Sequence, residues 1–279
     1  MDNKHFNIWN KVCAALAFVV SAVTYLLTIE PTASFWDCGE FIASSYKLEV
    51  GHPPGNPVFQ LIARLFTLFS EGQGAAVAVN AMSAICSALT IFFLYLTIVF
   101  LVKRIVKRED DGSYALSSAI TIFASGLVGA LAYCFSDTFW FSAVEGEVYA
   151  MSSLFTAAVF WAMTKWYDQA DEPHSLRWIV LIAFLMGLSI GVHLLNLLTI
   201  PCLFFLFYFR KKEDGRYSFW QLAGVFLLSC VVLLLVMAFI QYLPKTAAFF
   251  DRIFVNGFHL PFNSGAAFFM VLLLLLCFV

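Results

Sequence analysis

The feature that most constrains this chain is a series of apolar segments about as long as a lipid bilayer is thick. A membrane-spanning helix needs about 20 mostly apolar residues, with a range of about 17–25. Only 12% of the 279 residues are charged, whereas soluble domains carry about 25%. Such a chain cannot cover a water-soluble globule, so much of its surface must face lipid. We predict eight spans, at residues 12–29, 76–102, 118–135, 149–166, 178–192, 195–209, 219–241 and 266–279.

Two of these segments admit another interpretation. Residues 178–209 could form one helix, but 32 residues would reach about 48 Å, so we favour two spans that meet at 193–196. The first run could be a signal peptide. Its apolar stretch is at the long end for one, and no small-x-small pattern precedes Glu30, so we favour an uncleaved anchor.

The Lys and Arg residues predict the orientation of the spans. With the N-terminus in the cytoplasm, twelve of them fall on the inner side and four on the outer side, which is the bias of membrane proteins. The sequence therefore predicts an all-α polytopic membrane protein. Because the eighth span is only half complete, we expect residues 1–279 to be the N-terminal part of a longer chain. A net charge of −2 provides no basic field for nucleic acid.

The seven cysteines do not form a disulfide framework, because their number is odd and most lie inside apolar runs. We interpret them as small apolar fillers. A Cys38–Cys134 bridge is left open as the alternative, provided that both residues reach the outer face.

The first outer loop, at about residues 30–75, concentrates the polar residues of the chain. Ser34 followed by Asp37 resembles a capping box, so we predict a short helix from about 35 to 47. Asp37 and Glu40 would share one face of it, where their like charges repel. That arrangement stabilises no isolated helix and suggests a functional purpose.

A rigid turn and a second helix complete this loop. The sequence Gly51-His52-Pro53-Pro54-Gly55 excludes a helix because of its consecutive prolines. Asn56 suits an N-cap and Pro57 a first helical turn, so residues 58–70 should form an amphipathic helix along the outer leaflet. Its expected apolar stripe is Phe59, Ile62, Phe66 and Phe69, with Gln60 and Arg64 off the stripe.

Three further outer patches carry polar residues: 136–147 with the pair Glu145 and Glu147, 193–196 with His193 and Asn196, and a last outer loop with Lys245, Asp251, Arg252 and His259. Acidic residues in such loops often only solvate them, and a lone histidine is often a packing residue. His52 could simply cap its turn. Asp37 is different, because a carboxylate beside Trp36 and Phe41 near lipid is costly. A divalent ion on Glu145, Glu147 and one more carboxylate is a weak signal.

Four sequence words resemble a known family. They are Pro31-Thr-Ala-Ser-Phe-Trp-Asp37-Cys-Gly-Glu40-Phe, Gly51-His-Pro-Pro-Gly55, Glu145-Gly-Glu147-Val-Tyr149 and Gly191-Val-His193-Leu-Leu-Asn196. With an early acid in a long first outer loop, they resemble the protein O-mannosyltransferase-like family of GT-C membrane glycosyltransferases, which has bacterial and animal members. The resemblance covers essentially the whole chain. Family members continue into more spans and a soluble C-terminal part.

The resemblance implies a GT-C-like helix bundle that moves a sugar, expected to be mannose, from a polyprenyl-phosphate donor to Ser or Thr of an exported protein. It places this multi-pass protein in a bacterial inner membrane, with the active site on the outer face. Asp37 matches the catalytic first-loop acid. Glu40 lies three positions later, whereas the better-known O-mannosyltransferases have an adjacent Asp-Glu pair.

The remaining roles follow from the same mechanism. The acceptor hydroxyl needs a carboxylate to take its proton, and the leaving lipid phosphate needs cations or donors. We expect His52, Arg64, His193 and Arg252, with Lys245 as a further candidate, to bind the donor phosphate, and Glu145, Glu147 and Asn196 to shape the sugar or acceptor site. No metal ligand is assigned, and a divalent cation stays optional as a cofactor.

Two other classes of function compete with this prediction. A flippase or transporter of lipid-linked sugars would place charges and broken helices near mid-membrane, whereas here the spans are nearly free of charge. A non-catalytic membrane scaffold would not need Asp37 beside a double-proline turn. Substitution of Asp37 by Asn separates the three.

Overall fold

The computed structural model describes residues 1–72, 74–212 and 215–277, and all regular structure in these ranges is helical. The chain divides into two compact units. The first comprises Met1–Thr199 and a short stretch from Phe209, and the second comprises Ile200–Tyr208 and the C-terminal helices. The helices are α1 (Asn3–Leu27), α2 (Cys38–Lys47), α3 (Pro57–Thr67), α4 (Gly74–Ile105), α5 (Leu116–Cys134), α6 (Asp137–Ala143), α7 (Val148–Gln169), α8 (Leu176–Ile190), the 3₁₀ helix η1 (Leu194–Thr199), α9 (Ile200–Lys211), α10 (Phe219–Phe258) and α11 (Ser264–Cys277).

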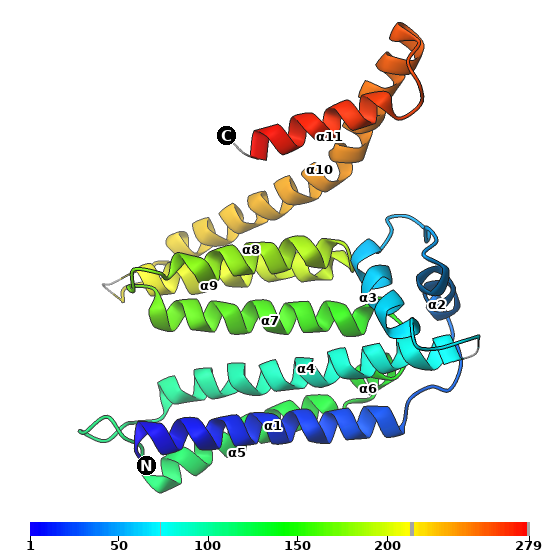
Figure 1. Cartoon of the computed structure of the whole chain (residues 1–279). Helices are drawn as coiled ribbons and strands as arrows, with labels where there is room; N and C mark the ends of the chain where they lie inside the picture. The colour runs from blue at the N-terminus through cyan, green and yellow to red at the C-terminus, as the bar shows by residue number, and fades with distance from the viewer. Residues whose placement is uncertain (73, 213–214, 278–279) are drawn as a thin grey trace. The chain divides into compact units, whose positions relative to one another are not determined.

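The first unit is a helix bundle with α4 at its centre (Figure 1). This helix packs against α1, α5 and α7, and α7 packs in turn against α8. A small residue brings α5 close to α4, because a Cβ added at Gly126 would lie 2.7 Å from the Tyr95 ring. Tyr95 and its neighbour Ile91 are fully buried in the resulting core.

The short helices of the first unit gather at one end of this bundle. Figure 1 shows α2, α3 and α6 beside the same end of α4, while the connections after α4 and α7 lie at the opposite end. The first outer loop and the 136–147 patch, both predicted for the outer side, thus lie at one end of the first unit. The break predicted near 193–196 is confirmed, since α8 ends at Ile190 and η1 begins at Leu194.

Five helical stretches among the described residues are long and apolar enough to cross a membrane: α1, α4, α5, Leu194–Lys211 and α10. Of the other predicted spans, α8 has 15 residues and α11 has 14, which is below the minimum of about 17. The 22-residue α7 has the length but includes Lys165 and Asp168. The chain is an all-α polytopic membrane protein.

The predicted capping box at Ser34 is wrong. Helix α2 begins at Cys38, with Asp37 itself at the N-cap position and no side-chain cap hydrogen bond. The cause is Trp36, whose φ of 61° is left-handed and breaks any helical path through residues 35–37. The carboxylate of Asp37 is therefore left free of the helix end.

The predicted apolar stripe of α3 is also wrong in part. Its buried face contains Phe59, Gln60, Ala63 and Thr67, whereas Phe69 lies beyond the helix and is 95% exposed. Gln60 faces inward because its Nε2 donates to the Ser44 hydroxyl of α2 at 3.0 Å. Packing of α3 against α2 and α4 thus selects its buried face.

The last outer loop is much shorter than predicted. In the second unit, α10 continues through Pro244, so Lys245, Asp251 and Arg252 lie on a helix. Only residues 259–263 connect it to α11. Asp251 accepts backbone N–H groups of Asn263 and Gly265, so this carboxylate caps α11 instead of solvating a loop.

All seven cysteines are free. Cys38 and Cys134 are both buried, and the bridge left open between them is not formed. The thiol of Cys38 instead donates to the Glu147 carboxylate, so Cys38 acts as a hydrogen-bonding partner of an acid.

Candidate active site

Asp37 lines a cavity of about 230 Å³ at the end of the first unit where α2 and α3 lie. The cavity is also lined by His52 from the proline turn, Glu147 and Tyr149 at the start of α7, and His193 after α8. All four of the sequence words that carry the family resemblance thus contribute residues to one cavity. The exposed position of Asp37 at the N-cap of α2 leaves its carboxylate accessible to a ligand.

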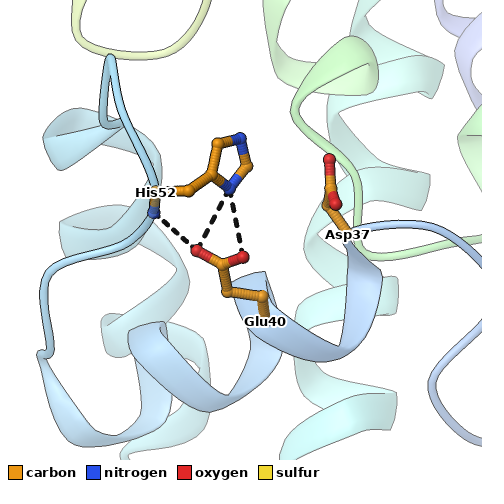
Figure 2. A group of neighbouring side chains, drawn as sticks. All are labelled: Asp37, Glu40 and His52. Atoms are coloured by element: carbon orange, nitrogen blue, oxygen red, sulfur yellow. Dashed lines mark hydrogen bonds and ion pairs between the residues drawn. The ribbon is translucent and has the colours of Figure 1, made fainter.

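Glu40 and His52 connect α2 to the proline turn. The backbone N–H of His52 donates to Glu40 Oε1 at 2.6 Å, and His52 Nδ1 lies 3.1 Å from both oxygens of Glu40. Figure 2 shows His52 reaching Glu40 from the neighbouring loop, with the Asp37 carboxylate beside them. These hydrogen bonds lower the pKa of Glu40, so Glu40 is a fixed negative charge at neutral pH.

His193 forms part of the opposite wall and packs against the Tyr149 ring, with centroids 5.4 Å apart. The backbone N–H of Leu195 donates to His193 Nδ1 at 3.2 Å. In the neutral ring the proton is therefore on Nε2. Burial lowers the pKa of His193, so the side chain is a neutral hydrogen-bond donor.

Glu145 and Glu147 are buried, at 4% and 5% exposure, instead of solvated in a loop. The Cys38 thiol and the Val148 backbone N–H donate to Glu147, whereas Glu145 Oε2 has no partner among the described residues. Burial raises the pKa of both carboxyls. Only Glu147 lines the cavity.

Gly146 explains the spacing of these two acids. A Cβ at this position would lie 3.0 Å from Asn80 Oδ1 and 3.2 Å from side-chain carbons of Ile42 and Val79. The backbone between the two carboxyls therefore packs directly on α2 and α4, which places Glu145 and Glu147 inside the protein.

Neither predicted arginine lines the cavity. Arg64 Nη1 donates to the Tyr46 carbonyl at 2.6 Å, and its guanidinium lies over the Tyr46 ring. This arginine therefore joins α3 to the end of α2. Arg252 lies on α10 of the second unit.

Asn196 is fully buried and does not line the cavity either. Its Nδ2 donates to the Ser189 hydroxyl at 2.8 Å, and its Oδ1 accepts from the Thr156 hydroxyl at 3.2 Å. These hydrogen bonds hold η1 against α7 and α8. Asn196 is therefore close to His193 in sequence but lies outside the cavity that His193 lines.

Two residues of the cavity were missed as site residues. Asn56, expected only as an N-cap, is 5% exposed and lines the cavity, and neither of its side-chain polar atoms has a hydrogen-bond partner within the described part of the chain. Tyr149 follows Glu147 by two positions and contacts His193. The position of Tyr149 just after the acidic pair could have indicated its role. Nothing in the sequence indicated that the Asn56 amide would be buried without a hydrogen-bond partner.

A second, more apolar cavity of about 420 Å³ lies among α4, α5 and α7. Small and hydroxylated side chains such as Thr90, Gly129 and Ser152 line it. Tyr149 lines both cavities, so the two spaces are neighbours on either side of one side chain.

The chain is similar in sequence to known proteins of one family. A family model described as "Protein O-mannosyl-transferase TMEM260 N-terminal domain" matches residues 37–216. The chain is 26% identical over 223 residues to protein O-mannosyl-transferase tmem260 of Dictyostelium discoideum, covering 75% of this chain and 24% of that protein. It is 29% identical over 199 residues to protein O-mannosyl-transferase TMEM260 of Mus musculus, covering 71% and 26%. The chain thus spans about a quarter of the length of these curated relatives. No solved structure matches it.

Proposed function

This chain belongs to the family of the protein O-mannosyl-transferase TMEM260 N-terminal domain, and we propose that it carries the catalytic site of a membrane glycosyltransferase with a GT-C-like bundle. The donor is a polyprenyl-phosphate sugar, with mannose as the sugar, and the acceptor is Ser or Thr of an exported protein. The observation that carries the proposal is the accessible carboxylate of Asp37 in a cavity shared with His52, Glu147, Tyr149 and His193.

Asp37 is proposed as the general base. The acceptor hydroxyl oxygen attacks the anomeric carbon of the sugar as the bond from that carbon to the phosphate oxygen breaks, through an oxocarbenium-like state. The hydroxyl proton passes to the Asp37 carboxylate, and the lipid phosphate leaves with the bonding electrons. A carboxylate can do this when it lies within hydrogen-bond reach of the hydroxyl.

His193 and His52 are proposed to meet the phosphate of the donor. The proton that His193 carries on Nε2 makes it a donor without adding a charge. The Glu40 carboxylate orients the His52 ring and acts through it as a positioning residue. Donors aimed at developing negative charge are among the larger contributions to catalysis.

Glu147 is proposed to contact the sugar or the acceptor, because its carboxyl is held by Cys38 and reaches the cavity. Glu145, which is buried and does not line the cavity, is proposed to help position Glu147. The polyprenyl chain is assigned to the apolar cavity among α4, α5 and α7, since Tyr149 lines that cavity as well as the polar one.

We propose that the N-terminus is cytoplasmic and that the catalytic cavity opens on the opposite face of the membrane, as the distribution of Lys and Arg predicts. Placement in a bacterial inner membrane stays a prediction from the family resemblance. Both relatives named above are eukaryotic.

The proposal is tested in cells that lack the gene and receive either the wild-type protein or Asp37→Asn. Mass spectrometry of exported proteins should show hexose on Ser and Thr only with the wild type. If the protein were a scaffold, cells with Asp37→Asn would keep these glycans. If it were a flippase, it would catalyse no sugar transfer, and Asp37→Asn would have no transfer step to remove. Glycans that persist without the gene would overturn the proposal.

A further inference from the structure

The catalytic cavity has an unusual charge balance for the ligand that it is proposed to hold. Asp37 and Glu147 line it and Glu40 is hydrogen-bonded to the lining residue His52, while none of its described lining residues is Lys or Arg. Arg64 is engaged with the Tyr46 carbonyl. An anionic phosphate brought next to these carboxylates is repelled unless a positive charge accompanies it.

Three side chains at this cavity have the spacing of metal ligands. One ligand atom each from Asp37, Glu40 and His52 lies within 4.8 Å of the other two. Two of these residues come from the first turn of α2 and its cap, and the third from the proline turn (Figure 2). Carboxylate oxygens with one imidazole are a donor set that divalent cations such as Mn²⁺ accept.

A fourth group at the cavity lacks a partner. Asn56 is only 5% exposed, and neither its Oδ1 nor its Nδ2 has a hydrogen-bond partner among the described residues. A Cβ added at Gly51 would lie 3.2 Å from Glu40 Oε1 and 3.7 Å from Asn56 Oδ1. The two oxygens thus face the same side of the Gly51 backbone, and a buried polar group without a partner suggests a missing ligand.

We propose that Asp37, Glu40, His52 and the Asn56 Oδ1 atom bind one divalent cation of the Mg²⁺ or Mn²⁺ class. The two carboxylates balance the charge of the ion, and the His52 backbone N–H continues to hold Glu40 from outside the coordination shell. The role of the ion rests on the proposed function: with His52 on the ion, the ion takes over the contact of His52 with the donor phosphate. His193 keeps its own contact with the phosphate, and the second oxygen of Asp37 stays available for the acceptor hydroxyl.

The binding test needs no enzymatic activity. The purified 279-residue chain in detergent is titrated with Mn²⁺, and free Mn²⁺ is measured by electron paramagnetic resonance, with Mg²⁺ as competitor. We expect one Mn²⁺ per chain. Even outer-shell partners of metal ligands contribute about 10–100-fold to affinity, and Glu40 is proposed as a direct ligand, so Glu40→Gln should weaken binding at least tenfold.

Glu49→Gln is the matched control, because Glu49 is exposed just after α2 and pairs with Lys47 at 3.9 Å. This variant should bind Mn²⁺ like the wild type. Absence of stoichiometric binding, or equal affinities for Glu40→Gln and Glu49→Gln, would overturn the cation site.

A second measurement separates this inference from the proposed function. Sugar transfer by the wild type is measured after chelation with EDTA and after Mn²⁺ is returned. Loss and recovery support both. Transfer that is unaffected by EDTA overturns the cation site and leaves the transferase standing, whereas site-specific Mn²⁺ binding by a chain without transfer overturns the transferase alone.

Discussion

The backbone carbonyl of Gly191 accepts the N–H groups of Val58 at 2.8 Å and of Phe59 at 3.3 Å. The contact is so close that a Cβ added at Gly191 would lie 2.5 Å from Val58 Cγ2. It joins the first turn of α3 to the turn that follows α8. Because Asn56 precedes one partner and His193 follows the other, this contact sets the separation of two walls of the catalytic cavity.

Gly191→Ala should therefore loosen the cavity. The added methyl group must displace Val58 or its backbone, and we expect a loss of about 1–3 kcal/mol in the free energy of unfolding, as for other overpacked contacts. Thermal unfolding in detergent checks this. The KM for the lipid donor should rise in the same variant.

Gly187→Ala is the control for this substitution. Gly187 lies one turn earlier in α8 and has nothing within 4 Å of an added Cβ, so alanine should leave stability unchanged or raise it by up to about 1 kcal/mol. Adding Val58→Ala to Gly191→Ala should recover part of the loss. Independent, additive effects of the two substitutions would contradict the contact.

Glu145→Gln should change how stability depends on pH. Burial raises the pKa of Glu145 above its ordinary 4.5, so the folded chain holds this proton more tightly than the unfolded chain. That advantage is complete below the ordinary pKa and is lost as pH rises through the raised pKa. Since glutamine has no proton to lose, the free energy of unfolding of the variant should exceed that of the wild type near pH 8.

The difference between Glu145→Gln and the wild type should shrink as the pH is lowered towards the ordinary pKa of the carboxyl. Unfolding temperatures across this pH range give the comparison. Glu71→Gln, at an exposed position between α3 and α4, should follow the wild type throughout. A constant offset for Glu145→Gln at every pH would show that ionisation of the carboxyl is not involved.

His193 offers a test of which ring nitrogen matters. Asparagine can accept the Leu195 N–H as Nδ1 does, but it lacks a donor at the position of Nε2. His193→Asn should thus fold normally and lower kcat/KM by about 10–100-fold, the value of a hydrogen bond to a charged group at about 1.5–3 kcal/mol.

His193→Gln supplies the converse variant, because its amide reaches the Nε2 position and loses the acceptor for Leu195. It should unfold at a lower temperature but keep more activity per folded molecule than His193→Asn. The opposite order of activities would mean that His193 supports the turn and does not contact the donor.

Local sequence patterns predicted the features that local chemistry decides. The turn at 51–55 follows from its prolines and the start of α3 from Pro57 in its first turn, whereas the Asn56 side chain makes no capping hydrogen bond. The break before η1 followed from span length alone. All of these depend on residues adjacent in sequence.

Tertiary packing decided the rest. Gln60 faces the core because Ser44, sixteen positions earlier, accepts its hydrogen bond. Glu145 is buried because Gly146 packs against α2 and α4. Arg64 is occupied by the Tyr46 carbonyl across the α2–α3 pair. No pattern of spacing within a segment contains these partners, so the sequence could name several residues of the cavity but could not show that Arg64 lies outside it.

The most direct measurement is the rate at which membranes containing the chain transfer mannose from polyprenyl-phosphate mannose to a Ser/Thr peptide. Asp37→Asn should lower kcat by about 10²–10⁴-fold, the usual contribution of a general base, with the unfolding temperature unchanged. Asp137→Asn, which alters another exposed carboxylate at the start of a short helix, α6, should match the wild type. Equal rates for Asp37→Asn and the wild type would contradict the assignment of Asp37 as the catalytic base.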